Sequence, residues 1–270
     1  MQYILLGTVL TTACGALFSQ QKLLTVASPH STPPATQTNV EMASRFQVGA
    51  NYTYAHIKPS GHSATHGNIG GMQALYEFRA PNRIYGGVAF AWRQGETEGK
   101  GGERFLRDYD VEERIGYTIA NSEDTWRVTL FSGFGYRHLG EKVRTHGSPV
   151  TFNYNEFYIP LAFLVEGKVS SLVSLGFNFQ WMPQVYSTVT IVPLKGARWI
   201  IDNRVDNFMV ELPLTVQVSR KHHLSMMFVP FFELWHDGDT DAKTATGVSL
   251  DVPSNTYLFA GLNVNLCYSF

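Results

Sequence analysis

The fold is decided by the final stretch of the chain, Leu262-Asn263-Val264-Asn265-Leu266-Cys267-Tyr268-Ser269-Phe270. Successive side chains of a β-strand point to opposite faces, so a strand over these residues separates apolar groups from polar ones. Its apolar face would carry Leu262, Val264, Leu266, Tyr268 and Phe270. An amphipathic strand that ends on an aromatic residue suits the boundary between a membrane and water. The terminal strand of a soluble domain is the alternative.

The same alternation repeats upstream, from Arg45 onward, in segments separated by breaks. The first segment places Phe46, Val48, Ala50, Tyr52 and Tyr54 on one face and Gln47, Gly49, Asn51 and Thr53 on the other. Counting such segments gives ten strands, with eight or twelve as alternatives. The sequence therefore predicts an all-β protein, an antiparallel up-and-down transmembrane β-barrel.

The breaks between segments alternate in length, which distinguishes a membrane barrel from a soluble sandwich. The tight breaks are 80–83, 121–124, 167–170 and 219–222. The long polar breaks are 57–67, 94–107, 139–153, 183–204 and 236–255. Barrels of the bacterial outer membrane have short periplasmic turns and longer external loops. We therefore expect periplasmic termini, with external loops around Gly99, Gly147, Lys195 and Asp241.

Composition agrees with a barrel wall and excludes other classes. Charged residues make up 16% and aromatic residues 13% of the 270 residues, and the mean hydropathy is −0.10. Alternating lipid-facing and lumen-facing positions average to such values. Beyond the N-terminus no apolar run reaches the roughly 18 residues that a membrane-spanning helix needs. The net charge of −1 predicts no nucleic-acid partner.

The N-terminal residues are interpreted as a secretion signal followed by a leader. The stretch 3–18 is short, mostly apolar and rich in small residues, which is typical of a signal peptide over 1–19, with an end as late as 27. Thr12-Ala13-Cys14 also allows lipidation at Cys14, and a buried N-terminal helix is a further alternative. Residues 20–44 contain many Ser, Thr and Pro residues and are expected to form a disordered periplasmic leader. The barrel is then 45–270.

The segment 45–270 resembles the small outer-membrane barrels of Gram-negative bacteria, the OmpA-, OmpX- and Opa-like proteins, in its pattern and without a diagnostic internal motif. Its last residues, from Leu262 to Phe270, resemble the signal that the barrel assembly machinery recognises in a final strand. The resemblance implies a multi-pass barrel in the cell outer membrane. It also implies outer-membrane lipids and the assembly machinery as partners, with a host or surface ligand at the loops.

Charged residues on the polar phase of the strands predict a lumen network. A narrow barrel interior is filled by side chains, and mixed charges there can pair. The predicted network comprises Glu77, Arg79, Arg93, Glu112, Arg114, Arg127, Arg137, Glu211 and Glu233. A merely polar lumen is the simpler reading. Glu113 falls on the apolar phase, so a bulge or shifted register is expected beside it.

Candidates for chemistry are few. Asp108 and Asp110, with His236, invite comparison with the omptin outer-membrane proteases, which activate water with Asp and His residues on opposite rims. No His lies near Asp202 or Asp206 in the sequence, and the two Asp candidates also fit an inward rim pair balanced by Arg residues. His62 and His66 lie in a Gly/Ser loop without preset metal geometry. We expect no catalytic site, metal or cofactor.

The sequence favours a barrel with a charge-filled, closed lumen that displays long loops in a structural, adhesive or host-interaction role. A narrow, porin-like channel for small solutes is one alternative. A rim hydrolase of the omptin kind is the other.

Overall fold

The computed structural model describes residues 43–144, 149–192, 198–240 and 252–270. The predicted signal peptide, Cys14 and nearly all of the predicted leader lie outside these residues, as do Gly147, Lys195 and Asp241. Within the described ranges, no helix is long and apolar enough to cross a membrane.

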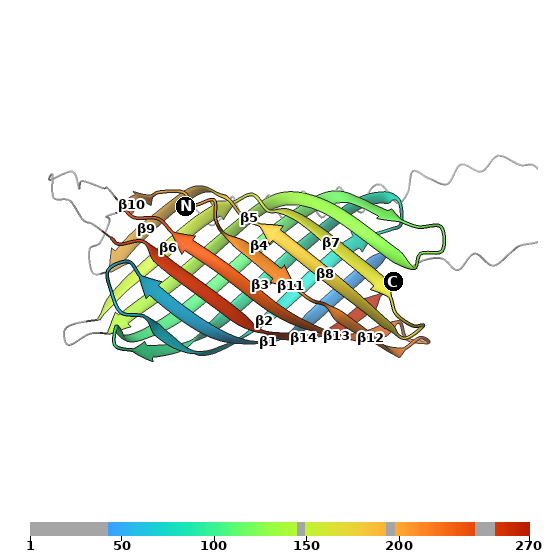
Figure 1. Ribbon diagram of the computed structural model, residues 1–270, viewed down its shortest axis with the longest axis horizontal. Helices are drawn as coiled ribbons and strands as arrows, with labels where there is room; N and C mark the ends of the chain where they lie inside the picture. Colours follow the sequence, from blue (N-terminus) through green and yellow to red (C-terminus); the bar gives the residue numbers. More distant parts are fainter. Residues whose placement is uncertain (1–42, 145–148, 193–197, 241–251) are drawn as a thin grey trace, which may run out of the picture. The chain divides into compact units, whose positions relative to one another are not determined.

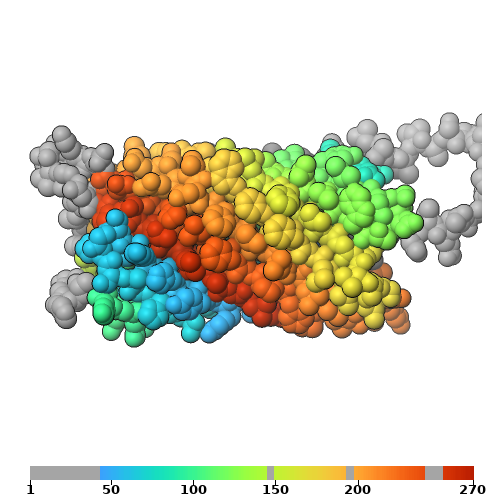
Figure 2. Space-filling view, in the orientation of Figure 1, coloured from blue at the N-terminus to red at the C-terminus, as the bar shows by residue number. Residues whose placement is uncertain are grey.

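The described chain is a closed antiparallel β-barrel of ten wall strands, as the sequence predicts. The wall closes where the first and last strands pair along their whole length, from Arg45 opposite Ser269 to Pro59 opposite Asn255. Figure 2 shows these two strands, in blue and red, lying directly against each other. The hydrogen-bonded segments are β1 (Ser44–Pro59), β2 (Thr65–Arg79), β3 (Arg83–Gly99), β4 (Gly102–Ala120), β5 (Trp126–Arg144), β6 (Val150–Tyr158), β7 (Leu161–Lys168), β8 (Val173–Trp181), β9 (Gln184–Val192), β10 (Arg198–Ile201), β11 (Phe208–Glu211), β12 (Leu214–Ser219), β13 (Leu224–Asp237) and β14 (Asn255–Ser269).

Proline residues divide three of the wall strands into shorter segments. Pro160 separates β6 from β7, Pro183 separates β8 from β9, and Pro213 separates β11 from β12. A proline has no N–H to donate to a neighbouring strand, so the regular ladder stops there. Isolated bonds bridge the gaps: the Ile159 N–H donates to the Pro183 carbonyl at 3.1 Å. The wall therefore stays continuous (Figure 1).

The two ends of the barrel differ in how they connect the strands. At the turn end, where the C-terminus lies (right in Figure 1), the connections after β2, β4 and β12 are tight. They contain Asn82, Asp124 and His223 with φ of 52°, 49° and 53°. Asn and Asp tolerate this left-handed conformation better than most residues, which explains two of the three turns.

The hairpin end, which carries β10 and the β3–β4 hairpin, corrects the prediction of long loops. The segment 94–107 is strand except for a tight connection, because Gly99 pairs with Gly102. Gly102 has φ +98°, a conformation that favours glycine. The segment 57–67 likewise contains the end of β1 and the start of β2. The outward residues of these strand ends are mostly polar, so in the sequence they resemble a loop.

The bulge or shifted register expected beside Glu113 is absent from β4. Glu113 pairs with Val88 on β3 and with Phe134 on β5, and both registers run without a shift along β4. Strand alternation therefore places its side chain on the outer surface of the wall. The regular ladder is maintained although a carboxylate lies among apolar neighbours.

Candidate functional site in the barrel interior

The half of the interior toward the hairpin end contains a hydrophobic core, together with buried charges such as the Arg104–Glu141 ion pair. In β1 the polarity reverses after Tyr54: Ala55 and Ile57 are fully buried, while His56 and Lys58 point outward. The other strands contribute in the same way, and the buried apolar cluster includes Ile69, Leu106, Leu139, Val189, Trp199, Trp235, Tyr257 and Phe259. The sequence reading missed this core because it expected a polar inward phase throughout. The reversal itself, visible as Ala-His-Ile-Lys after Tyr54, was the available signal.

A layer of paired arginines lies beneath this core. The Arg93 Nε atom donates to Asp108 at 2.8 Å, and its terminal nitrogens donate to both oxygens of Glu233 at 2.8 and 2.9 Å. Arg137 donates to the same Asp108 at 2.9 and 3.0 Å. Because β3 and β13 are not neighbours in the wall, the Arg93–Glu233 pair spans the lumen. We call these residues the arginine layer.

Aromatic rings of the core cover the arginine layer. The Arg93 guanidinium carbon lies 3.9 Å from the centre of the Phe259 ring, and that of Arg137 lies 4.5 Å from the Trp235 ring. Cations at such distances are attracted to the ring faces. The arginine layer therefore lies between the hydrophobic core, toward the hairpin end, and the polar lumen, toward the turn end.

The other residues of the predicted network pair closer to the turn end. Glu77 accepts from Arg45 Nε at 2.7 Å, Arg79 bonds Glu166, Arg114 bonds Glu112, and Arg127 donates to Asp124 at 2.5 Å. Arg45, Glu166 and Asp124 were absent from the predicted network. Strand phase indicates which face a residue occupies but not its partner. Arg45 and Glu77 are cross-strand neighbours, and Arg114 and Arg127 find partners close by in the chain. Arg79 on β2 meets Glu166 on β7, a strand that only the closed barrel brings near. Glu211 has an amide rather than a cation beside it, since Asn178 donates to it at 2.7 Å.

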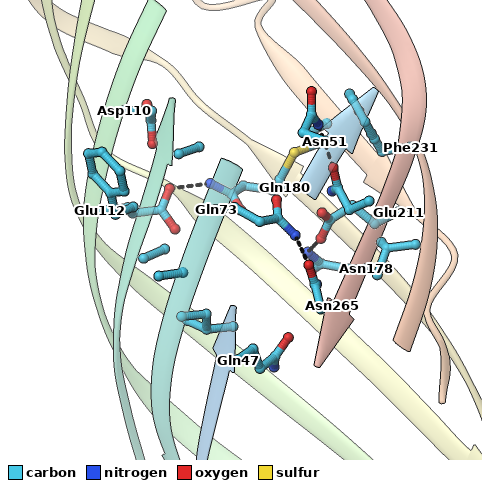
Figure 3. Close-up of a pocket in the computed structure, with 18 of the residues that line it drawn as sticks. Gln47, Asn51, Gln73, Asp110, Glu112, Asn178, Gln180, Glu211, Phe231 and Asn265 are labelled. Carbon is cyan, nitrogen blue, oxygen red and sulfur yellow. Dashed lines mark hydrogen bonds between the residues drawn. The ribbon is translucent and has the colours of Figure 1, made fainter. Parts of the chain in front are cut away.

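A cavity of about 180 Å³ lies in the lumen beneath the arginine layer. Its polar lining contains several amides, among them Gln47, Asn51, Gln73, Asn178, Gln180 and Asn265. Figure 3 shows Asp110 and Glu112 on one side of it and Asn178 and Glu211 on the other. Met182, Met209 and Phe231 supply an apolar part of the lining.

The structure does not bring the predicted hydrolytic residues together. Asp108 is only 2% exposed and is held by two arginines. His236 lies between the inward residues Trp235 and Asp237, so alternation places it on the outer face of the wall, with its Nδ1 atom 2.8 Å from Asp206. General-base catalysis requires hydrogen-bond reach. The barrel wall separates His236 from Asp108 and Asp110.

The histidines and acidic residues that the structure describes form no metal centre. In the part of the chain that the structure describes, no three His, Cys, Asp or Glu residues are arranged to hold a metal ion. His66 projects outward on β2, where its ring centre lies 6.4 Å from that of Tyr54, and His62 is exposed in the turn after β1.

The predicted assembly residues all lie on the outer face of β14 or directly after it. Leu262, Leu266, Tyr268 and Phe270 are exposed, and Val264 is partly buried between neighbouring strands. The ring centre of Phe270 lies 5.7 Å from that of Tyr268 and 6.4 Å from that of Tyr76. Its N–H donates to the Ser44 carbonyl at 2.9 Å. These contacts join the end of the last strand to the beginning of the first.

Comparison with known proteins identifies the fold and no family. No protein-family model matches the chain, and no curated protein sequence matches it. The outer membrane protease OmpT from Escherichia coli matches with a TM-score of 0.55 and 10% identity, over 84% of this chain and 96% of that chain. The translocator domain of autotransporter NalP from Neisseria meningitidis matches with a TM-score of 0.46 and 10% identity, over 96% of this chain and 97% of that chain. The likeness to OmpT shows that the chain has the fold of a bacterial outer-membrane β-barrel.

Proposed function

We propose that this protein is a multi-pass β-barrel of a Gram-negative outer membrane, with its turn end in the periplasm. The exposed apolar band supports the proposal, because soluble proteins rarely expose a contiguous apolar surface of more than a few hundred Å². Large apolar side chains are exposed around the turn half, for example Val48, Met72, Ile115, Leu130 and Leu175. Lipid is the medium that such a surface fits.

Aromatic residues border this band on both sides, as they do in membrane barrels. Trp92 and Tyr109 face each other across β3 and β4 near the hairpin end, and Tyr136 packs on Phe157 at 4.9 Å. At the turn end, the Tyr117 hydroxyl donates to the Asn82 carbonyl at 2.8 Å. Tyrosine and tryptophan rings favour the membrane–water interface, so the two rows support a membrane positioned around the turn half.

Within that membrane, the protein acts as a closed barrel that displays its hairpin end rather than as an open channel. One observation carries this function: the hairpin half of the interior is packed with buried apolar side chains above the arginine layer. Conduction needs a continuous wet path, which a packed core excludes. The role is structural or adhesive, as in the OmpA-, OmpX- and Opa-like barrels. Its partners are outer-membrane lipids, the assembly machinery and a surface or host ligand at the hairpin end.

Planar-bilayer recording tests the closed lumen. We expect the purified protein to show no steady conductance. A Trp235→Ala/Tyr257→Ala variant, which removes two large rings from the core, should open brief conducting events. The matched control is Tyr52→Ala/Tyr54→Ala, which removes two rings from the outer face of β1 and should stay silent. A large steady conductance of the wild-type protein would refute closure and establish the narrow channel.

A further inference from the structure

The lumen cavity beneath the arginine layer is large enough for a small ligand. Its volume is about 180 Å³. An engineered apolar cavity of roughly 150 Å³ binds benzene, so a ligand with about six to nine non-hydrogen atoms fits. The cavity lies below the core that fills the hairpin half, and its description does not depend on which way the barrel crosses a membrane.

Two carboxylates of the cavity have no cationic partner. Asp110 accepts from the Tyr158 hydroxyl at 2.9 Å, and Glu211 accepts from Asn178 at 2.7 Å. Among the described residues, no Lys or Arg nitrogen lies within 4.0 Å of either carboxylate. Arg114 lines the same cavity but bonds Glu112. The cavity is lined by five arginines and seven acidic residues, so carboxylates outnumber guanidiniums in a place where an uncompensated charge is costly.

Two amide oxygens of β8 lack donors in the same region. Asn178 and Gln180 are 4% and 1% exposed, and neither Asn178 Oδ1 nor Gln180 Oε1 has a hydrogen-bond partner. The amide orientations are fixed, because the Asn178 nitrogen donates to Glu211 and the Gln180 nitrogen donates to Glu112. Turning either amide would place its oxygen against a carboxylate oxygen. Buried acceptors normally have donors, so these oxygens point to a missing donor.

The chemistry of the missing group follows from its surroundings. Carboxylates and amide oxygens accept hydrogen bonds, so the group that satisfies them donates several and carries positive charge. A metal ion is disfavoured, since no described cluster has three metal-binding side chains in place. The thioethers of Met182 and Met209 and the ring of Phe231 line the cavity as well, and they suit a hydrocarbon body.

We propose that the lumen cavity binds a small organic cation, a primary ammonium group on a compact apolar body. The ammonium group donates to Glu211 and to the free oxygens of Asn178 and Gln180, and the Asp110 carboxylate on the other side of the cavity adds to the negative potential that attracts it. Its apolar body rests against Met182, Met209 and Phe231. This site would give the closed barrel a ligand-binding role in addition to display.

Calorimetric titration of the purified full chain in detergent tests the ligand class. The probes are cyclohexylammonium, the neutral cyclohexanol and the anionic cyclohexanecarboxylate, which share one apolar body. We expect saturable binding of the ammonium, binding of the alcohol weaker by about tenfold or more, and none of the carboxylate, because charged hydrogen bonds are the stronger ones. Equal binding of alcohol and ammonium would overturn the proposal. So would tight binding of Ca²⁺ alone without binding of the ammonium.

Variants locate the site. Glu211→Gln and Asp110→Asn keep the shape of each side chain and should each weaken cyclohexylammonium binding by about tenfold. The matched control is Glu113→Gln, which removes a carboxylate of the same strand as Asp110 from the opposite face of the wall. It should bind as the wild type does. Heat-modified gel mobility confirms that each variant is folded, and unchanged binding by folded Glu211→Gln and Asp110→Asn would refute the site.

Discussion

The turn half and the hairpin half of the barrel are built from the same strands with opposite polarity. In the turn half of β1, Phe46 and Val48 are exposed and Gln47 is buried. In the hairpin half of the same strand, Ile57 is buried and His56 points outward. Strand geometry fixes the alternation of faces, whereas the medium outside the wall decides which face is apolar. The change of polarity along one strand therefore marks the edge of the apolar band.

The largest effect is expected where the outer face of the last strand meets the first. Phe270→Asp places a carboxylate beside Tyr268 and Tyr76, where β14 must pair with β1 to close the barrel. We expect no assembled barrel in the outer membrane, measured by heat-modified gel mobility of membrane fractions. Thr256→Asp puts the same charge on the outer face of β14 in the hairpin half and should assemble. Equal assembly of both variants would contradict the difference between the halves.

A charge in the core of the hairpin half should be the next most damaging change. Leu139 is fully buried, and its neighbour His138 points outward on the same strand. Leu139→Asp should lower the free energy of unfolding by about 4 kcal/mol or more, since it removes a core side chain and buries a charge. His138→Asp should change it by no more than about 0.5 kcal/mol. Urea unfolding in lipid vesicles measures both, and similar losses would mean that the hairpin half has no packed core.

Ion pairs that cross the turn half should show a smaller and reversible effect. Arg79 on β2 bonds Glu166 on β7, and both are mostly buried. Glu166→Leu leaves the guanidinium without its partner and should cost roughly 3 kcal/mol. Arg79→Met/Glu166→Leu should recover most of that loss, because no unpaired charge remains. If the double variant is less stable than Glu166→Leu in the same unfolding assay, the pairing argument is wrong.

The smallest effect concerns the exceptional carboxylate on the outer face of the turn half. Glu113→Leu should stabilise the barrel in lipid vesicles by about 1 kcal/mol, since acidic residues near the membrane midplane cost less than basic ones. Glu96→Leu, on the outer face of β3 in the hairpin half, should give no such gain. Unfolding midpoints in vesicles and in detergent measure the difference. If Glu96→Leu alone raises the stability in vesicles, the lipid surrounds the hairpin half and not the turn half, and the proposed membrane position is wrong.

Sequence reasoning located the strands and their faces more reliably than the partners inside. The outward phase from Phe46 to Tyr54 and the all-β barrel of ten strands are confirmed. The long loop predicted at 94–107 was wrong, because polar outward residues of β3 and β4 resemble a loop when the core beneath them is not yet known. The bulge expected at Glu113 was wrong as well, since a regular ladder is maintained there.

The sequence by itself determined the alternating strands, the tight turns around Asn82 and Asp124, and the inward phase of the charged residues. These are local properties, set by the two-residue period of a strand and by the conformations that turn residues tolerate. Only the tertiary structure decided that Arg93 reaches Glu233 across the lumen and that Asp110 and Glu211 share a cavity without a cation. These partners lie on strands far apart in the chain, so closure of the barrel, rather than any local pattern, brings them together.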